Sequence, residues 1–180
     1  MLETFKILFL AFFDICRLVK KPQDIPESKN FLTLCLLCYA LLSILLAGLS
    51  QPVEGAIVAG LLDVVLIMLF TYALLQINGK LPRWPQTVTA LAGTGIIMSI
   101  IALPVYLMIG IGDVDELTLT SEQTMGLLLL AILACWNIVI MSHILKHALE
   151  THFAIAFFLT LTYVWIAFSF TSAVMSAGTS

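Results

Sequence analysis

Charged residues are scarce in this chain: Asp, Glu, Lys and Arg make up only 11% of its 180 residues. A soluble domain carries about a quarter. Hydrophobic residues reach 61%, and the mean hydropathy is +1.10, so a globule of this size could not bury its apolar surface in water. The composition therefore excludes a water-soluble domain and intrinsic disorder. With eight basic residues and a net charge of −3, it also excludes a cationic face for nucleic acid.

Cysteine is scarce as well, with Cys16, Cys35, Cys38 and Cys135 as the only four. Cys35 and Cys38 form a C-x-x-C inside the apolar run Phe31–Leu49, without a second such pair or a nearby histidine. Because zinc needs four N or S ligands, we interpret these cysteines as small apolar side chains. Catalytic triads, P-loops, glycine-rich nucleotide loops and haem-binding motifs are missing too. We therefore expect neither an enzyme nor a bound cofactor.

The chain does have five apolar runs, each about as long as the roughly 20 residues that a membrane-crossing helix needs. The runs are Asn30–Leu49, Val53–Ile77, Thr87–Ile111, Gln123–Lys146 and His152–Val174. Lipid offers the backbone no hydrogen-bond partner, so runs this long and uniformly apolar are expected to be helices. The sequence predicts an all-α membrane protein with a five-helix transmembrane domain over residues 30–180.

Residues 1–29 are predicted to form an amphipathic helix and a linker. Charged residues recur along one narrow stripe of the helix, and large apolar side chains cover the rest of its surface. The stripe contains Glu3, Lys6, Asp14, Arg17 and Lys21. We expect this helix to lie along the membrane interface. Burial in a groove between the spans is the alternative.

The basic residues predict the orientation of the chain in the membrane. Five precede the first span, two lie between the second and third spans, and one lies between the fourth and fifth. The positive-inside rule makes these segments cytoplasmic. It predicts a cytoplasmic N-terminus, five spans and an outer C-terminus. An acidic tract with Asp113, Asp115 and Glu116 would then face the outside.

Asp63 is the only acidic residue deep within a span. A charge at the bilayer centre costs about 3 kcal/mol, so we expect this side chain to face protein or to be protonated. One interpretation is a carboxylate that handles protons or cations. The other is a neutral acid hydrogen-bonded to a neighbouring span, for example to a Ser or Thr. No basic residue lies deep enough in a span to pair with it.

Small residues in two of the spans predict seams at which helices pack closely. The seams contain Ala56, Ala59 and Gly60 in the second span and Ala90, Gly93 and Thr94 in the third.

The end of the fourth span carries His143, His147 and Glu150, one above another at positions i, i+4 and i+7. Two histidines one turn apart hold zinc in the zincins, but Ile144 stands where those enzymes have their catalytic glutamate. The alternative is an amphipathic helix end that contacts headgroups or a partner. We predict a shared contact surface at the cytoplasmic face. Its residues are Lys80, Arg83, Gln86, His143, Lys146 and His147.

Three further features carry a family resemblance: the segment KKPQDIP at residues 20–26, the segment RWPQTVTALAGT at 83–94, and Leu103-Pro104. With five spans, they resemble the YIP family of polytopic membrane proteins, in its small bacterial branch. The resemblance implies a non-enzymatic protein: in eukaryotes one of membrane traffic and membrane shaping, in bacteria a protein of the inner membrane.

We therefore expect a membrane-organising or accessory scaffold subunit. Its partners would be membrane lipids and either other integral membrane proteins or further copies of itself. One alternative is a small transporter or channel subunit centred on Asp63. Another is a metal- or haem-linked accessory protein that uses His143 and His147.

Overall fold

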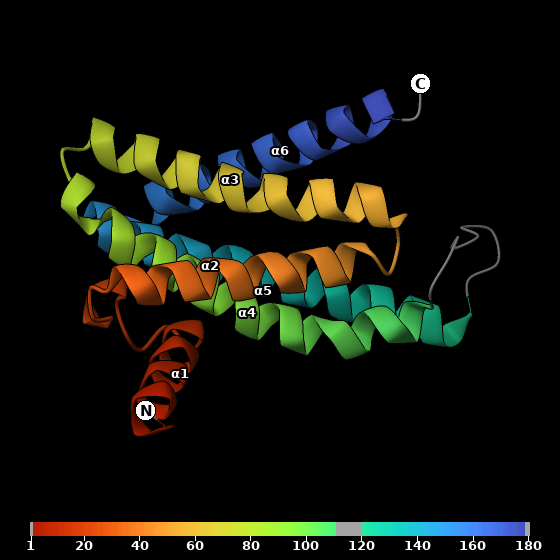
Figure 1. Ribbon diagram of the computed structural model, residues 1–180, viewed down its shortest axis with the longest axis horizontal. Coiled ribbons are helices and arrows are strands. Elements are labelled where there is room, and N and C mark those ends of the chain that lie inside the picture. Colours follow the sequence, from red (N-terminus) through yellow and green to blue (C-terminus); the bar gives the residue numbers. More distant parts are fainter. Residues whose placement is uncertain (1, 111–119, 179–180) are drawn as a thin grey trace.

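The structure is a computed structural model that describes residues 2–110 and 120–178, and both ranges fold into helices without a strand (Figure 1). The α-helices are α1 (Leu2–Cys16), α2 (Lys29–Ala47), α3 (Val53–Ile77), α4 (Trp84–Ile109), α5 (Ser121–Leu149) and α6 (Phe153–Gly178). Two short 3-10 helices precede α2 and α4: η1 (Pro22–Asp24) and η2 (Leu81–Arg83). The predicted acidic tract of Asp113, Asp115 and Glu116 lies outside the described residues.

Helices α2 to α6 are all long and apolar enough to cross a membrane, which makes the chain a multi-pass membrane protein in architecture. The prediction of an all-α fold with five spans is confirmed. Helix α3 has the predicted bounds, whereas α4 begins at Trp84 instead of Thr87 and α5 runs on to Leu149 instead of Lys146. Pro85 does not delay α4, because a proline in the first turn of a helix costs no hydrogen bond.

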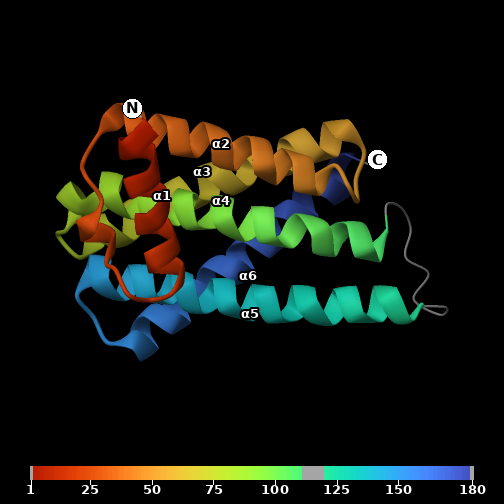
Figure 2. The ribbon, with the colours of Figure 1, turned by 90° about the horizontal axis from the view of Figure 1, so that it is seen from below.

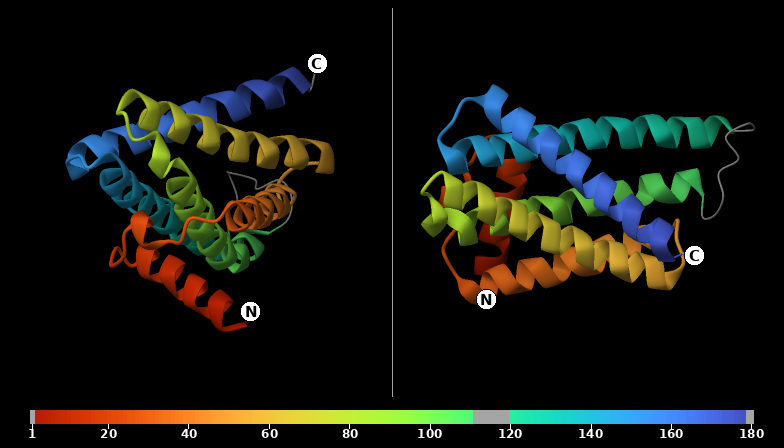
Figure 3. Two further views of the ribbon diagram at one scale, coloured as in Figure 1. Left: turned by 60° about the vertical axis from the view of Figure 1, so that its left-hand side comes forward. Right: turned by 90° about the horizontal axis from the view of Figure 1, so that it is seen from above.

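The spans alternate in direction around α4, which lies between α2 and α5 (Figure 2). In an apolar stretch of 18 residues within the α4 span, 56% of the residues are buried inside the protein, against 11–17% in the corresponding stretches of the other four spans. Helix α6 starts beside α5 and runs diagonally across the bundle to α3 (Figure 3). We call the end with the α3–α4 and α5–α6 connections the basic end, because Lys80, Arg83 and Lys146 lie there, and the opposite end the far end.

Helix α1 lies across the bundle near the basic end and packs on α4 and α5 (Figures 2 and 3). Phe12 and Ile15 are buried against the spans, whereas Phe9 and Phe13 are 48% and 42% exposed. A Cβ atom at Gly93 would stand 2.3 Å from the Phe12 ring, so the docking of α1 requires a residue without a side chain on α4. The C-terminal half of α1 therefore packs against protein, and its other face is open to the surroundings.

The predicted seams lie where helices meet closely. Ala56 and Gly60 are buried, and a Cβ at Gly60 would come within 2.9 Å of the Ile44 backbone nitrogen on α2. Ala59 is partly exposed beside them. On α4 the three seam residues Ala90, Gly93 and Thr94 are buried. Thr94 donates to the Ala90 carbonyl of its own helix at 2.9 Å, so its hydroxyl needs no partner on another span.

Candidate functional site

Asp63 is held by hydroxyl groups from two other spans. Tyr39 of α2 donates to Oδ2 at 2.5 Å, and Tyr163 of α6 donates to Oδ1 at 3.1 Å. Ser43 of α2 reaches the same Oδ2 at a marginal 3.5 Å. One carboxyl group on α3 thereby ties three helices together. Among the described residues its contacts include no ion pair.

Asp63 lies deep in the bundle. At about 1.5 Å of rise per residue it is roughly 15 Å from the far end of α3 and about 21 Å from the basic end. The hydroxyl donors supply the carboxyl group with the polar partners that lipid cannot offer. The sequence placed this acid inside a span and offered a Ser or Thr on a neighbouring span as an example of a partner, and Ser43 of α2 makes such a contact at 3.5 Å. The two short contacts come instead from tyrosines, whose length lets them reach across to α3.

A polar cleft leads from the far end of the bundle to Asp63. It has a volume of about 290 Å³, and its lining includes Ser50 and Gln51 of the α2–α3 turn as well as Ser43 and Asp63. Gly60 and Ala59 form part of its wall on α3, so the small residues that let α2 approach α3 also leave room for this cleft. The Gln51 Oε1 atom is buried and has no hydrogen-bond partner. The cleft therefore presents several oxygen atoms along its length, from the far end to the carboxylate.

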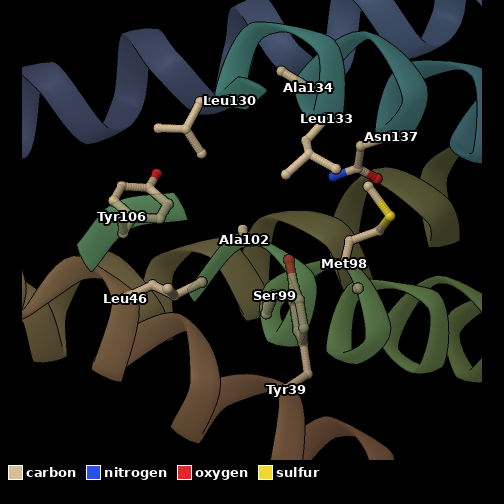
Figure 4. A pocket seen from close by; sticks show the side chains of 11 residues that line it. Tyr39, Leu46, Met98, Ser99, Ala102, Tyr106, Leu130, Leu133, Ala134 and Asn137 are labelled. Atoms are coloured by element: carbon tan, nitrogen blue, oxygen red, sulfur yellow. The ribbon is translucent and has the colours of Figure 1, made fainter. Parts of the chain in front are cut away.

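A second cavity of about 290 Å³ lies between α2, α4 and α5 (Figure 4). Tyr39, the residue that donates to Asp63, forms part of its lining, and Tyr106 lines both spaces. Ser99 and Asn137 face it from α4 and α5 (Figure 4). In the part of the chain that the structure describes, the side chains of Ser99, Tyr106 and Asn137 form no hydrogen bond. This cavity is therefore lined by polar groups as well as by apolar side chains.

The basic end contains a second polar cluster, which closes the C-terminus of α5. The last carbonyls of a helix have no partners within it. Here Gln23 donates to the His147 carbonyl at 2.7 Å, Arg83 to Ala148 at 3.3 Å and Lys80 to Leu149 at 2.7 Å. Three side chains from elsewhere in the chain therefore cap one helix end.

Glu150 completes this cluster. It ends α5 in the left-handed conformation, with φ of 50°, which is strained for a residue other than glycine. Its carboxylate accepts from Lys80 at 2.7 Å and from Arg83 at 2.5 Å. These hydrogen bonds from Lys80 and Arg83 lower the pKa of Glu150 from 4.5 to about 2. The two cations thus hold the turn into α6, where the sequence has neither Gly nor Pro.

The two histidine rings lie close together, and the His143 ring also contacts the backbone near the end of α1. The rings of His143 and His147 are 4.6 Å apart at an angle of 70°, and His143 Nε2 lies 3.1 Å from the Lys20 carbonyl. Glu150 is engaged with the two cations described above. Over residues 2–110 and 120–178, no three His, Cys, Asp or Glu side chains are grouped as metal ligands would be.

Most of the predicted contact surface at the basic end is used inside the protein. Lys80 and Arg83 cap α5, and Gln86 donates to the Ile25 carbonyl at 3.1 Å. Lys146 differs, because its ammonium makes no ion pair with any described residue. Trp84, beside this surface, donates its indole N–H to the Met68 carbonyl at 3.2 Å. The structure brings these residues to one end of the bundle, and it engages most of them in contacts with other parts of the chain.

The sequence pattern alone assigned neither Tyr39 nor Tyr163 to this site. Both are tyrosines in the middle of apolar runs, which is the available signal, since a phenolic hydroxyl at that depth needs a partner. Comparison of the chain with family models, curated proteins and solved structures finds no match.

Proposed function

We propose that this chain is a non-enzymatic, YIP-like integral membrane protein that acts as a membrane-organising or accessory scaffold subunit. The observation that carries the proposal is an uncovered apolar groove on α5. It has a volume of about 520 Å³ and runs from Leu128 to Val139 along the helix, with Ile132 and Trp136 in its lining. Both side chains are large and exposed, at 64% and 44%.

The partner of this groove is a transmembrane helix, from another integral membrane protein or from a second copy of this chain. The groove lies where α6 has diverged from α5 toward α3, so no other described helix covers it (Figure 3). Ala131 and Cys135 lie between the large side chains, and small residues let helix backbones approach in lipid.

We place this scaffold in a bacterial inner membrane, with the basic end and α1 at the cytoplasmic face. The one-sided distribution of lysine and arginine supports this orientation. In it, the exposed Phe9 and Phe13 of α1 would insert into the headgroup region. Membrane-impermeant labelling of single cysteines introduced at exposed Lys29 and at Glu54 tests the orientation. We expect labelling from outside at position 54 only, and labelling at position 29 instead would reverse the topology.

Photo-cross-linking in native membranes tests the scaffold. A photoreactive residue at position 132 or 136 should form adducts with a membrane protein, and an adduct of twice the mass would identify a second copy. Phe168 on α6 provides the matched control, because it is 73% exposed but lies outside the groove. Adducts with lipid alone at all three positions would contradict the proposal.

The cleft to Asp63 favours a second candidate function, a small transporter or channel subunit. A carboxylate at mid-membrane beside a polar space is the feature that solute and ion pathways share. Flux of small cations through proteoliposomes, compared between the wild type and Asp63→Asn, tests this candidate. Equal flux in both proteins and in empty vesicles would eliminate it.

A further inference from the structure

A narrow pocket of about 110 Å³ lies between α1, α2 and α4, and nearly all of its surface is apolar. The rings of Phe12 on α1 and Phe31 on α2 stack 5.8 Å apart, at an angle of 8°, and together form one of its walls. Three helices from different parts of the chain therefore enclose one apolar space. Its lining includes Phe9, Phe12, Phe31, Cys38, Gly93 and Ile97.

This pocket suits an apolar occupant and not water. A buried water needs two to four polar partners, and an apolar cavity of about 150 Å³ stays dry and takes up molecules such as benzene. An empty pocket would forfeit the dispersion contacts of its lining. Two lining residues, Phe9 and Leu34, are each 48% exposed, so the pocket opens to the surroundings beside them. In a membrane, the surroundings of such an opening are acyl chains.

The pocket lies at the depth of acyl chains. Lys29, where α2 begins, is exposed and forms no ion pair with any described residue, which suits the level of the headgroups. Along α2, Phe31 and Cys38 are about 3 and 14 Å below it. One leaflet contributes about 15 Å of hydrocarbon. On the face of Leu34, two turns further on, Leu41 is 68% exposed and continues the apolar surface toward the far end.

Helix α1 determines which apolar molecule can enter. It lies across the bundle here, and Phe9 and Phe12 cover the pocket from above (Figure 2). A membrane-spanning helix, about 10 Å wide, could not lie along α2 and α4 at this place without displacing α1. The groove on α5 differs, because no described helix crosses it. A single acyl chain is thin and flexible enough to pass beneath α1.

We propose that this pocket binds one acyl chain of a membrane phospholipid, from the leaflet at the basic end. The chain fills the space between α2 and α4 and completes the packing of α1 on both helices. The site depends neither on the proposed scaffold function nor on the side of the membrane that the basic end faces. Helix cross-linking at α5 and lipid binding at α1 can therefore fail separately.

Photo-labelling of the full chain in nanodiscs tests the proposal. The probe is a phosphatidylcholine with a diazirine midway along one acyl chain, and mass spectrometry locates the adducts. Cys35 and Ile97 line the pocket but are only 4% and 5% exposed, whereas Leu41 lies on the open surface of α2. Lipid that merely surrounds the protein would label Leu41. We expect adducts at Cys35 or Ile97 as well, in spite of their burial.

The chain offers a pair of matched variants. Cys38→Phe should lower the adducts at Cys35 and Ile97 about tenfold, because the added ring takes up the space that the acyl chain would fill. Cys135→Phe is the control, since it makes the same substitution at an exposed cysteine outside the pocket. It should label as the wild type does. Adducts at Leu41 should stay unchanged in both variants.

Two results would overturn the proposal. One is a wild type whose adducts are confined to exposed positions such as Leu41. The other is equal labelling of Cys35 and Ile97 in the wild type and in Cys38→Phe, because the probe would then reach them by a route other than the pocket. If Cys38→Phe fails to fold, Cys38→Met, with a flexible side chain that adapts to irregular gaps, must still lower these adducts while Cys135→Phe does not.

Discussion

Polar groups at the basic end and in the middle of the bundle differ in the partners that they have. At the basic end, Lys80 and Arg83 meet both a carboxylate and the free carbonyls of α5, so charges and orphan backbone groups satisfy each other. In the middle, Asp63 has only neutral partners, and polar side chains around the second cavity have none. The difference is that charged groups close the helix end at the basic end, whereas neutral hydroxyl groups tie α2, α3 and α6 together at Asp63.

The largest expected effect comes from filling the small-residue contact that brings α2 to Asp63. Gly60→Leu would drive a side chain into the Ile44 backbone and force α2 away from α3. Overpacking costs about 1–3 kcal/mol, and here it would also separate the carboxyl from Tyr39 and Ser43. We expect a large loss of thermal stability in nanodiscs. Ala73→Leu, at an exposed position on the same helix, is the control and should change little.

The next effect tests the basic end. Replacing both Lys80 and Arg83 by methionine would remove the caps from the Ala148 and Leu149 carbonyls and leave Glu150 without its cations. Because the ion pairs are exposed, we expect a combined loss of about 2 kcal/mol, mostly from the helix end. Unfolding in a denaturing detergent measures it. Lys146→Met should leave the stability unchanged. An equal loss of stability in this variant would show that the effect comes from removing positive charge and not from the loss of the helix caps.

The contacts of Asp63 should give a smaller change. Tyr39→Phe and Tyr163→Phe each remove one hydroxyl donor and keep the ring, at an expected cost of about 1 kcal/mol. Tyr72→Phe serves as control, because Tyr72 is exposed and packs edge-on against Trp84. The free energy of unfolding measures the difference. If neither variant changes the free energy of unfolding, the tyrosine hydroxyl groups do not contribute to stability through Asp63.

The smallest effect concerns pH. Since the pKa of Glu150 is lower in the folded chain, its charged form stabilises the fold at pH values above about 4.5. That stabilisation is lost as the pH falls toward about 2. The difference in unfolding midpoint between wild type and Glu150→Gln should therefore shrink over this window, and more so in low salt, where exposed pairs are least screened. A constant difference across the window would contradict the role of the two cations.

The sequence predicted the spans well because crossing a bilayer imposes both length and apolar character, and each can be counted along the chain. It could not predict the end of α5, since the groups that close it, Gln23, Lys80 and Arg83, come from distant parts of the chain. The local sequence also does not predict that Glu150 adopts a left-handed backbone conformation. The turn there depends on tertiary contacts.

The site at Asp63 was only partly predictable for a similar reason. A lone acid in an apolar run can be found by eye, but its partners depend on how α2, α3 and α6 are rotated about their axes. The position of α1 shows the same limit, because an apolar helix face suits lipid and protein equally. Phe12 is buried against Gly93 of α4, so the C-terminal half of α1 packs on protein instead of lipid.

The burial of α4 has a consequence for how the protein experiences membranes of different thickness. Between Thr87 and Met98, α4 is mostly enclosed by its neighbours and presents little surface to acyl chains, so this part has little reason to adjust its tilt to bilayer thickness. The surrounding helices carry most of the lipid contact at this level and would accommodate most of a mismatch. A change in membrane thickness would therefore alter the tilt of the outer helices more than that of α4. Asp63 lies on one of these outer helices, α3.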